Sequence, residues 1–333
     1  MSKSVIVTGG SGYVGQRILG ELLSRNYKVI AIVRSQKSLD TLNTLFQNPP
    51  NLIFEIVPEL DKPNALDHIL QKYPDVEAFI SGAAVVKFQA DDFEKEVITP
   101  TIDIVKNTLT SIKNHAPQIK KVIFTSSAVV LSSPETIFSY DKVYSDNDWT
   151  PVTRDHVEQG GGMVAYFVAK KLSEQAAWEF KDQENPDFDI IAIQPTFVVG
   201  PAEFDSEVTF EKQPSTAAMI VGLLNLKPTD PIPVFANGWI DIRDVAKAHV
   251  DAIESEKYAN QRVLLEADKF TYDHVVKIIV DNFPEYKDKL PKPNPVDETA
   301  FVKVDDSRSR GIVGFEYKPL ENAVVDLIKQ LHK

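Results

Sequence analysis

The stretch VTGGSGYVGQRILGELL, Val7 to Leu23, places Gly9, Gly12 and Gly15 between an apolar run and a set of apolar residues at helical spacing. The run at Val5–Val7 predicts a strand. The later set, Val14, Ile18, Leu19 and Leu22, predicts an amphipathic helix. A glycine triplet alone indicates only a turn, but one that joins a first strand to a first helix is typical of dinucleotide-binding domains.

Each glycine has a physical role in that interpretation. Gly9 supplies the tight turn, Gly12 lets the backbone approach a pyrophosphate, and Gly15 allows the helix to lie close to the strand. The first turn of the helix offers free N–H groups and the positive end of its dipole. We therefore predict a phosphate-binding turn at this position.

Further apolar runs of strand length recur along the first two hundred residues, and helical patterns alternate with them. Near-continuous apolar runs are typical of parallel strands that are covered on both faces. The alternation predicts the α/β class, a doubly wound parallel sheet of the Rossmann type. The further predicted strands are Val29–Val33, Leu52–Val57, Ala78–Ser81, Val122–Thr125 and Ile190–Ile193.

Composition and charge narrow the classes of partner. The chain has 333 residues and a formal net charge of −12, which argues against nucleic acid or an anionic membrane surface as the main partner. No window approaches the roughly 18 apolar residues of a membrane span, and the N-terminus has no signal-peptide pattern. The absence of cysteine fits a reducing compartment, so we expect a cytoplasmic protein. The six histidines form no cluster, and we expect no metal site.

The end of the second predicted strand, AIVRSQKS (Ala31 to Ser38), indicates which dinucleotide binds. An NAD site usually carries an acidic residue here for the ribose 2′-hydroxyl, and this sequence has Arg34 and Lys37 instead. A guanidinium suits the 2′-phosphate of NADP through charge-assisted hydrogen bonds. The alternative is a pair of solvated surface cations. We predict NADP(H) as the cofactor.

The prolines that follow Gly200 divide the rest of the chain into short pieces. We expect residues 1–200 to form mainly the NADP-binding Rossmann domain. Residues 201–333 should form mainly a smaller substrate-binding lobe, with parts of the chain crossing between the two. No clear linker separates them, so the two parts are expected to fold as one unit.

The stretch AYFVAKKLSEQ, Ala165 to Gln175, places Tyr166 and Lys170 on one face of a predicted helix. A free tyrosine has a pKa of about 10, and a lysine ammonium beside it favours the phenolate. Two serines, Ser126 and Ser127, follow the predicted strand Val122–Thr125, at the edge where open α/β sheets bind ligands. A tyrosine and a lysine at this spacing also occur by chance in helices. Together with the glycine turn, they predict a general acid and a residue that tunes it.

These motifs occur in an order and spacing that resemble the extended short-chain dehydrogenase/reductases. The chain is most similar to the fungal NADPH-dependent methylglyoxal and 3-methylbutanal reductases, carbonyl reductases related to plant dihydroflavonol reductases. The resemblance extends nearly end to end, through VGFEYKPLENAV (Val313 to Val325). Besides TGGSGYVG, it rests on VIFTSSAVV, YFVAKK, QPTFVVGP and WIDIRDVAKAH.

The resemblance implies a set of site residues. Ser127 takes the position of the catalytic serine, Tyr166 that of the acid, and Lys170 that of its tuner, which also reaches the nicotinamide ribose. The implied cofactor contacts also include Gly9, Gly10, Ser11, Gly12, Tyr13, Val14, Arg34, Glu59, Leu60, Pro195, Val198 and Thr216.

Five places depart from the family pattern. One is Gln194, which replaces a common asparagine or histidine before Pro195. Relatives usually carry a lysine one residue after Lys37, and Glu59 stands where an aspartate is usual. The segment ISGAAVVKF, residues 80–88, stands where relatives often have threonine-alanine-serine-proline, so this wall of the expected cleft is altered. Asp103 takes the position of an asparagine whose backbone carbonyl helps to hold a water in the proton relay. These changes concern specificity more than chemistry.

The residues that we name for the substrate pocket are Phe88, Val129, Val164, Phe197 and Trp239, although each type of side chain is also common in ordinary packing. The segment between Ser132 and Met163 is long enough to be a lid, and Gly160–Gly162 could be its hinge or part of a flexible surface loop.

The sequence thus predicts an NADPH-dependent reductase of aldehydes and ketones in which Tyr166 donates the proton. The first alternative is a nucleotide-sugar epimerase or dehydratase that retains its cofactor, which would need a second anion-binding patch. The second is a non-catalytic NADP-sensing regulator. The expected partner is a small carbonyl substrate, and a homodimer is possible. The natural substrate and the stereochemistry of the product alcohol do not follow from the sequence.

Overall fold

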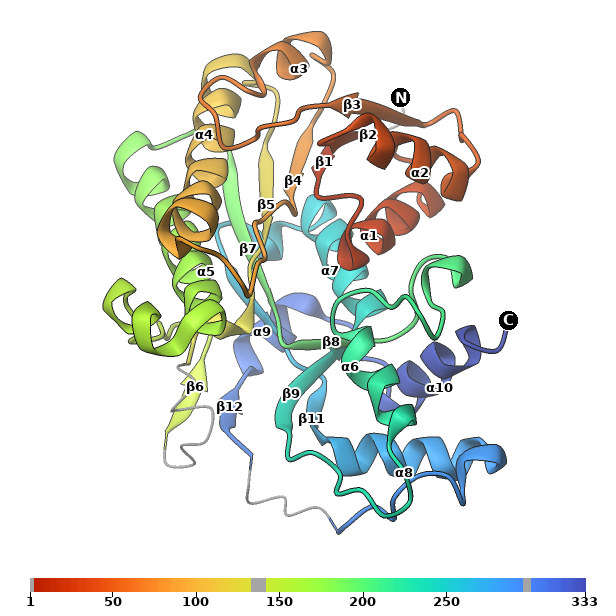
Figure 1. Cartoon of the computed structure of the whole chain (residues 1–333). Coiled ribbons are helices and arrows are strands. Elements are labelled where there is room, and N and C mark those ends of the chain that lie inside the picture. The colour runs from red at the N-terminus through yellow and green to blue at the C-terminus, as the bar shows by residue number, and fades with distance from the viewer. Residues whose placement is uncertain (1–2, 133–141, 296–300) are drawn as a thin grey trace.

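The computed structural model describes residues 3–132, 142–295 and 301–333. Within these ranges, seven parallel strands form the main sheet in the order β10-β7-β5-β4-β1-β2-β3 (Figure 1). The doubly wound α/β fold is confirmed, and each of the six predicted strands is present. The strands are β1 (Ser4–Thr8), β2 (Lys28–Val33), β3 (Leu52–Ile56), β4 (Ala78–Ser81), β5 (Lys121–Thr125), β7 (Asp189–Pro195) and β10 (Arg262–Leu265).

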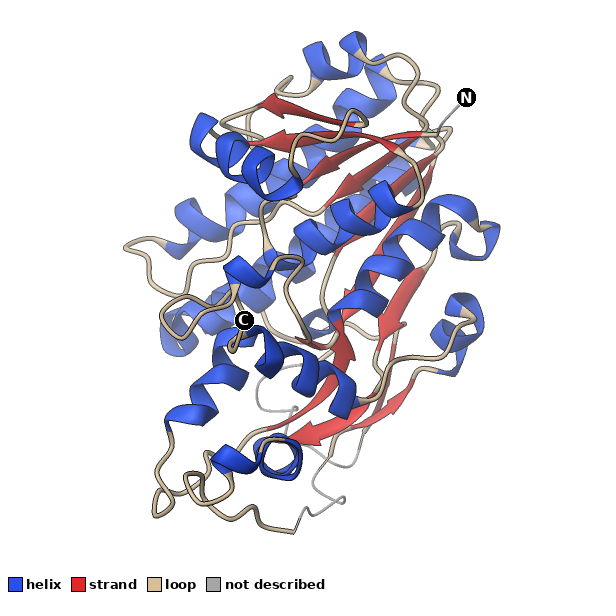
Figure 2. Cartoon of the chain, turned by 90° about the vertical axis from the view of Figure 1, so that its right-hand side faces the viewer, coloured by secondary structure: helices blue, strands red, loops and turns tan. Residues whose placement is uncertain are grey.

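Successive residues of the strands point to opposite faces of the main sheet. In β1, Val5 and Val7 pack with α1 (Tyr13–Ser24) and α7 (Ile242–Glu254). Ile6, between them, packs on the other face with α3 (Asp67–Lys72), α4 (Thr99–His115) and α5 (Val157–Glu184). α2 (Gln36–Phe46) packs beside β2 and β3. Figure 2 shows the resulting layers of helix, sheet and helix, which explain the near-continuous apolar runs.

The order of strands in the main sheet indicates where a ligand is expected to bind. The chain proceeds outward from β1 to β2 and β3, then returns to the other side of β1 with β4 and β5. Loops that leave the carboxyl ends of β1 and β4 therefore diverge, and open α/β sheets bind ligands at this point. The glycine turn, which follows β1, and the two serines, which follow β5, both lie at this edge.

A second group of elements lies beyond the carboxyl edge. β8 (Phe197–Val199), β9 (Ala236–Asp241) and β11 (Asp268–Thr271) form a small sheet, with β9 antiparallel to β11 and parallel to β8. Its core is shared with α6 (Ala217–Gly222), α8 (Tyr272–Asn282) and α10 (Leu320–Gln330). Beside it, β6 (Val143–Ser145) pairs with β12 (Lys303–Asp305), which precedes α9 (Ser307–Val313).

Short turns of 3-10 helix and one π-helical turn complete the described elements. The π-helical turn η1 (Glu94–Ile98) leads into α4. The 3-10 turns are η2 (Ala128–Val130), η4 (Arg154–His156), η5 (Asp205–Glu207), η6 (Leu223–Asn225), η7 (Glu256–Tyr258) and η8 (Pro284–Tyr286).

Residues beyond position 200 also belong to the main sheet. β10 forms its edge beside β7, and α7 packs on one of its faces. Asp241 caps α7 by accepting a hydrogen bond of 2.8 Å from the backbone N–H of Arg243. No helix in the described part of the chain combines the length and the apolar character needed to span a membrane.

The three glycines before the tyrosine lie inside α5 and not in a surface loop. Gly161 has a φ of +59° and kinks the helix. A Cβ at Gly162 would lie 2.2 Å from the carbonyl oxygen of Phe88, so this glycine lets α5 approach the segment after β4. Of the segment expected to form a lid, residues 133–141 lie outside the described residues.

Candidate active site

The glycine turn is a tight backbone cradle after β1. Gly9 has a φ of +76°, and a Cβ there would lie 2.5 Å from the carbonyl carbon of Gly82. A Cβ at Gly15 would lie 2.1 Å from the carbonyl oxygen of Gly9. Gly12 precedes the first residue of α1 and has no side chain to cap it. The N–H groups of the first turn therefore remain available to an anion.

The residues around these glycines divide between the cradle and the core. Ser11 is exposed, whereas Gly10 packs closely on the side chain of Leu19. The hydroxyl of Tyr13 donates to the carbonyl oxygen of Gly200, and burial raises the pKa of this phenol. Val14 packs against the core beneath α1 and α7 and also against the core of the small sheet. Only the backbone of Tyr13 and Val14 is therefore placed to contact a phosphate.

Arg34 and Lys37 lie at the carboxyl edge of β2 with exposed side chains. Neither forms an ion pair with any residue in the described ranges, which leaves both cations available to an anionic ligand. Between them, the hydroxyl of Ser35 caps α2 by accepting from the backbone N–H of Ser38 at 3.2 Å. This cap fixes the start of the helix that carries Lys37.

Glu59 and Leu60 follow β3, the neighbour of β2, so they lie at the same edge as Arg34. Glu59 is exposed and Leu60 is half-buried. The carboxylate of Asp103 affects a lysine that follows this segment, Lys62. The pKa of Lys62 is raised chiefly by its hydrogen bond to Asp61, with a smaller contribution from the Asp103 carboxylate.

The two serines after β5 face different partners. Ser127 caps the 3-10 turn η2, and its hydroxyl accepts from the backbone N–H of Val129 at 3.4 Å. Ser127 also lies close enough to the phenol of Tyr166 to lower the pKa of that phenol. Ser126 is buried, and its hydroxyl donates to the carboxylate of Glu174. The structure thus brings Ser127, not Ser126, to the tyrosine.

Tyr166 is half-buried on α5, and burial raises the pKa of its phenol. The nearby Ser127 side chain lowers this pKa, but its effect is smaller than that of burial. The sequence predicted that Lys170 would lower this pKa, but within this chain burial dominates. A phenol that keeps its proton at neutral pH is suited to donate it as a general acid.

Lys170 is almost fully buried one turn further along α5. Its Nζ donates a hydrogen bond of 2.9 Å to the carbonyl oxygen of Thr125. Burial lowers the pKa of Lys170 to about 8, and the charge of Glu174 opposes that shift. The lysine is therefore an ammonium held close to its titration point at neutral pH.

The residues expected around the nicotinamide come together where β7 leads into β8. Pro195 is the buried last residue of β7, and Val198 is half-buried in β8. The hydroxyl of Thr216 donates to the carbonyl oxygen of Val198 at 2.6 Å. Thr216 therefore holds the segment that follows Pro195.

The five expected pocket residues have different surroundings. Phe88 is 53% exposed, and its ring centroid lies 6.2 Å from that of Tyr166. Val129 and Val164 share one apolar cluster with the tyrosine. Phe197 contacts the rings of Phe235 and Phe270. Trp239 is only 2% exposed, inside the core that the small sheet shares with α6, α8 and α10, so its side chain has no surface to offer a substrate.

The structure also shows residues that sequence reasoning missed. Val86 and Met163 are 54% and 53% exposed and lie within a few positions of Phe88 and Tyr166. Glu174 and His249 are buried polar residues behind Lys170. The spacing of Glu174, four residues after Lys170, was a signal that could have been read from the sequence. The described residues contain no group of three or more potential metal-binding side chains.

A phosphate cradle at the switch point of a parallel sheet, with a serine, a tyrosine and a lysine after the next strands, defines the class of dinucleotide-dependent oxidoreductases. The chain belongs to the NAD dependent epimerase/dehydratase family, whose model matches residues 5–264. This match confirms the resemblance to the extended short-chain dehydrogenase/reductases.

Curated relatives and solved structures agree with this assignment. The chain is 32% identical to the putative NADPH-dependent methylglyoxal reductase GRP2 of Candida albicans, over 99% of this chain and 98% of that protein. It is equally identical, with the same coverage, to the NADPH-dependent methylglyoxal reductase GRE2 of Saccharomyces cerevisiae. The crystal structure of Gre2 in complex with NADPH from Candida albicans is similar with a TM-score of 0.94, at 37% identity over 99% of this chain and 98% of that one.

Proposed function

We propose that the protein is an NADPH-dependent reductase that converts aldehydes and ketones to alcohols. The observation that carries the proposal is that Ser127, Tyr166 and Lys170 gather at the edge of the main sheet that also holds the glycine turn. The relatives named as NADPH-dependent reductases support it, and none of the curated relatives given above is named as an epimerase or a regulator.

The residues present fit NADPH. Added Cβ atoms at Gly9 and Gly15 would collide with the protein's own backbone, so these two glycines permit the tight turn. Gly12, at the N-terminus of α1, leaves the main chain of that turn bare for a ligand. Arg34 and Lys37 are exposed cations at the edge beside it, suited to a 2′-phosphate. When bound, NADPH supplies a hydride to the carbonyl carbon. Lys170 would hold the nicotinamide ribose, with Pro195, Val198 and Thr216 beside the nicotinamide and Glu59 and Leu60 beside the adenine.

The chain's own residues handle the oxygen of the carbonyl. The hydroxyl of Ser127 donates a hydrogen bond to that oxygen and polarises it. As negative charge develops there, the phenol of Tyr166 transfers its proton, so that the oxygen becomes the hydroxyl of the alcohol. The ammonium of Lys170 stabilises the phenolate that remains. A general acid of this kind contributes roughly 10²–10⁴-fold to the rate.

We infer that apolar side chains beside the acid line the substrate pocket. Phe88, 6.2 Å from the ring of Tyr166, is exposed, as are Val86 and Met163, which are close to these two residues in the sequence. Val129 and Val164 belong to the same apolar cluster as Tyr166, and Phe197 lies in β8. This chemistry favours carbonyls with aliphatic or aromatic substituents. A nucleotide sugar would require a cationic patch, and none of these six residues is charged.

The test is NADPH oxidation, followed by absorbance, with a panel of aliphatic aldehydes, dicarbonyls and aryl ketones. We expect Tyr166→Phe to reduce kcat by roughly 10²–10⁴-fold because the proton donor is lost, while NADPH binding is retained. Tyr286→Phe, in the core of the second lobe, is the matched control and should keep wild-type activity. Turnover that survives in Tyr166→Phe would contradict the assigned acid, and a wild type inactive on every carbonyl would refute the reductase.

The remaining parts of the proposal concern the molecule's organisation. We propose that residues 1–200 form mainly the NADPH-binding domain and residues 201–333 mainly a substrate-binding lobe, with parts of the chain crossing between the two, in a cytoplasmic enzyme. Light scattering during size-exclusion chromatography decides between a monomer and a homodimer.

A further inference from the structure

Glu174 is a buried carboxylate that the proposed chemistry does not use. It is 5% exposed and lies four residues after Lys170 and eight after Tyr166, on the same face of α5. A buried charge is costly unless it is hydrogen-bonded. Four donors satisfy this one. Three come from other segments: the hydroxyl of Ser126, Nε2 of Gln194 at 2.9 and 3.2 Å, and Nε of Arg262 at 2.6 Å. The fourth is Nε1 of Trp178, four residues further along α5, at 3.3 Å.

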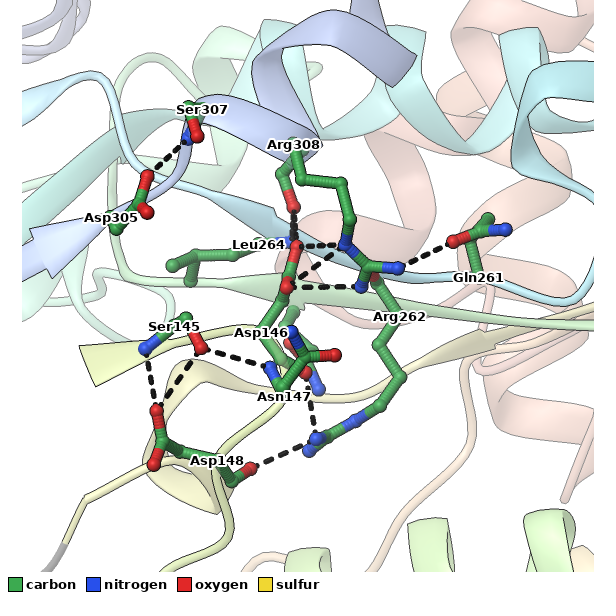
Figure 3. A network of polar contacts seen from close by, with 12 residues as sticks. Ser145, Asp146, Asn147, Asp148, Gln261, Arg262, Leu264, Asp305, Ser307 and Arg308 are labelled. Atoms are coloured by element: carbon green, nitrogen blue, oxygen red, sulfur yellow. Dashed lines mark hydrogen bonds and ion pairs between the residues drawn. The ribbon is translucent and has the colours of Figure 1, made fainter.

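Arg262 is itself fixed from the other side. Its Nη1 donates to the backbone carbonyl oxygens of Asp146, at 2.7 Å, and Asp148, at 2.9 Å (Figure 3). Its guanidinium also stacks 3.7 Å from the ring of Trp149. Neither member of the Glu174–Arg262 pair can rotate away without losing several contacts. The position of the carboxylate relative to Lys170 is therefore determined by the fold.

Glu174 faces Lys170 across a small cavity. The two side chains form no direct ion pair, but both line a space of about 20 Å³, together with Thr101, Thr125, Ser126 and Ser173. That volume is enough for one water molecule. Charges separated by a single water in a low-dielectric interior still interact strongly.

We propose that Glu174 is a positioning residue that keeps Lys170 in its ammonium form, and that the guanidinium of Arg262 limits the strength of this effect. The proposal rests on the proposed function for its consequence, because only a charged Lys170 stabilises the phenolate of Tyr166. It also explains why a lysine buried to this extent stays charged near neutral pH.

The other groups that face Lys170 leave Glu174 as its one negative neighbour within the described residues. Tyr166 is a neutral phenol, and the remaining lining groups on α4, β4 and β5 are hydroxyls, backbone and apolar atoms. Behind Thr125 lies His249, whose Nδ1 donates to the carbonyl oxygen of Val245 at 2.8 Å. Burial lowers the pKa of this imidazole to about 4, so it is neutral at pH 7 and its Nε2 accepts from the Thr125 hydroxyl at 2.9 Å.

The test measures the charge of Lys170 directly. Full-length protein is labelled with ¹³C at the lysine ε-carbons and titrated by NMR, and the resonance of Lys170 is assigned from its loss in Lys170→Met. We expect Glu174→Gln to lower the pKa of Lys170 by roughly one unit or more, the effect of removing a nearby opposite charge. Arg262→Gln should raise it, because it removes the positive charge that offsets the Glu174 carboxylate, while the hydrogen bonds from Ser126 and Gln194 remain. Glu174→Asp, which keeps the charge, should shift it less than Glu174→Gln.

Opposite signs in the two neutralising variants would support the proposal, since a purely structural role moves both in the same direction or moves neither. An unchanged titration of Lys170 in Glu174→Gln would overturn it. If Glu174→Gln does not fold, Arg262→Gln decides alone, and a pKa that fails to rise refutes the proposal. The alkaline limb of kcat/KM, measured in parallel, should move by the same amount. A wild type without carbonyl turnover would refute the reductase and leave the titration result standing.

Discussion

At the residue scale, the choice of cofactor depends on one exposed guanidinium. Arg34 directly follows β2 and has no ion-pair partner in the described ranges, so its charge is not already neutralised. A charge-assisted hydrogen bond to a phosphate contributes roughly 1.5–3 kcal/mol. We expect Arg34→Ala to weaken NADPH binding by about 10- to 100-fold and to change NADH binding by less than about 3-fold. Fluorescence titration with each nucleotide measures both.

The control for Arg34→Ala is Lys329→Ala, which removes an exposed cation from α10. It changes the net charge equally but lies outside the cofactor edge. An equal loss of NADPH affinity in both variants would mean that the effect comes from net charge and not from a specific contact.

His249 makes the stability of the protein depend on pH. It is fully buried, and burial lowers the pKa of its imidazole to about 4, below the unfolded value of about 6.5. The unfolded chain therefore takes up this proton first as the pH falls, and stability is lost between pH 6.5 and 4. From pH 7 to pH 5, the free energy of unfolding should fall by roughly 2 kcal/mol more in the wild type than in His249→Gln.

Denaturant unfolding of both proteins at pH 7 and pH 5 isolates this histidine, since the other titrating groups are common to the two. Equal pH dependence in wild type and variant would show that His249 titrates normally.

At the scale of elements, the glycine turn separates packing from binding. A Cβ at Gly15 would lie 2.1 Å from the carbonyl oxygen of Gly9, whereas a Cβ at Gly12 would meet that atom at 3.4 Å, an ordinary contact. We expect Gly15→Ala to lower both thermal stability and NADPH affinity. Gly12→Ala should keep the wild-type Tm and lose NADPH affinity, because its Cβ occupies the side that the phosphates approach. Thermal unfolding and nucleotide titration of the two variants test this.

The matched control is Gly311→Ala in α9, where an added Cβ meets nothing within 4 Å. It should equal or exceed the stability of the wild type, since alanine is the better helix former. If Gly12→Ala bound NADPH as tightly as the wild type, the turn would not be the phosphate site.

The same elements show what the sequence could predict. Six strands followed from apolar runs because helices cover both faces of the main sheet, and α1 followed from its periodicity. β10 was missed because Arg262–Leu265 is a short run whose pairing with β7 depends on distant residues. The kink at Gly161 was missed for a related reason. Three glycines indicate freedom, and only the contact with Phe88 shows that they serve close packing.

At the scale of the whole molecule, the site is assembled from segments far apart in the chain. Tyr166, Lys170 and Ser127 follow from local motifs, but the donors around Glu174 come from β5, β7 and β10. No local pattern brings these together. The burial of Trp239 likewise depends on how the small sheet packs against α8 and α10, so a sequence could not distinguish this core residue from a pocket wall.

A buried carboxylate, that of Asp146, connects two segments that are far apart in the sequence, and its contribution to stability can be tested. Asp146, 2% exposed, accepts hydrogen bonds from the Ser309 hydroxyl at 2.5 Å and from Arg308 Nε at 3.1 and 3.2 Å (Figure 3). It thereby joins the segment after β6 to α9. Asp146→Asn weakens these charge-assisted bonds, and we expect the free energy of unfolding to fall by roughly 1–3 kcal/mol.

NADPH affinity should not change in Asp146→Asn. The glycine turn and Arg34 follow β1 and β2, which are separated from β10 by three strands of the main sheet, β7, β5 and β4. Denaturant unfolding and nucleotide titration measure the two quantities separately. Asp182→Asn, which alters an exposed carboxylate on α5, is the control and should change neither. A loss of NADPH affinity equal to the loss of stability would mean that the segment after β6 and the cofactor edge respond as one cooperative unit.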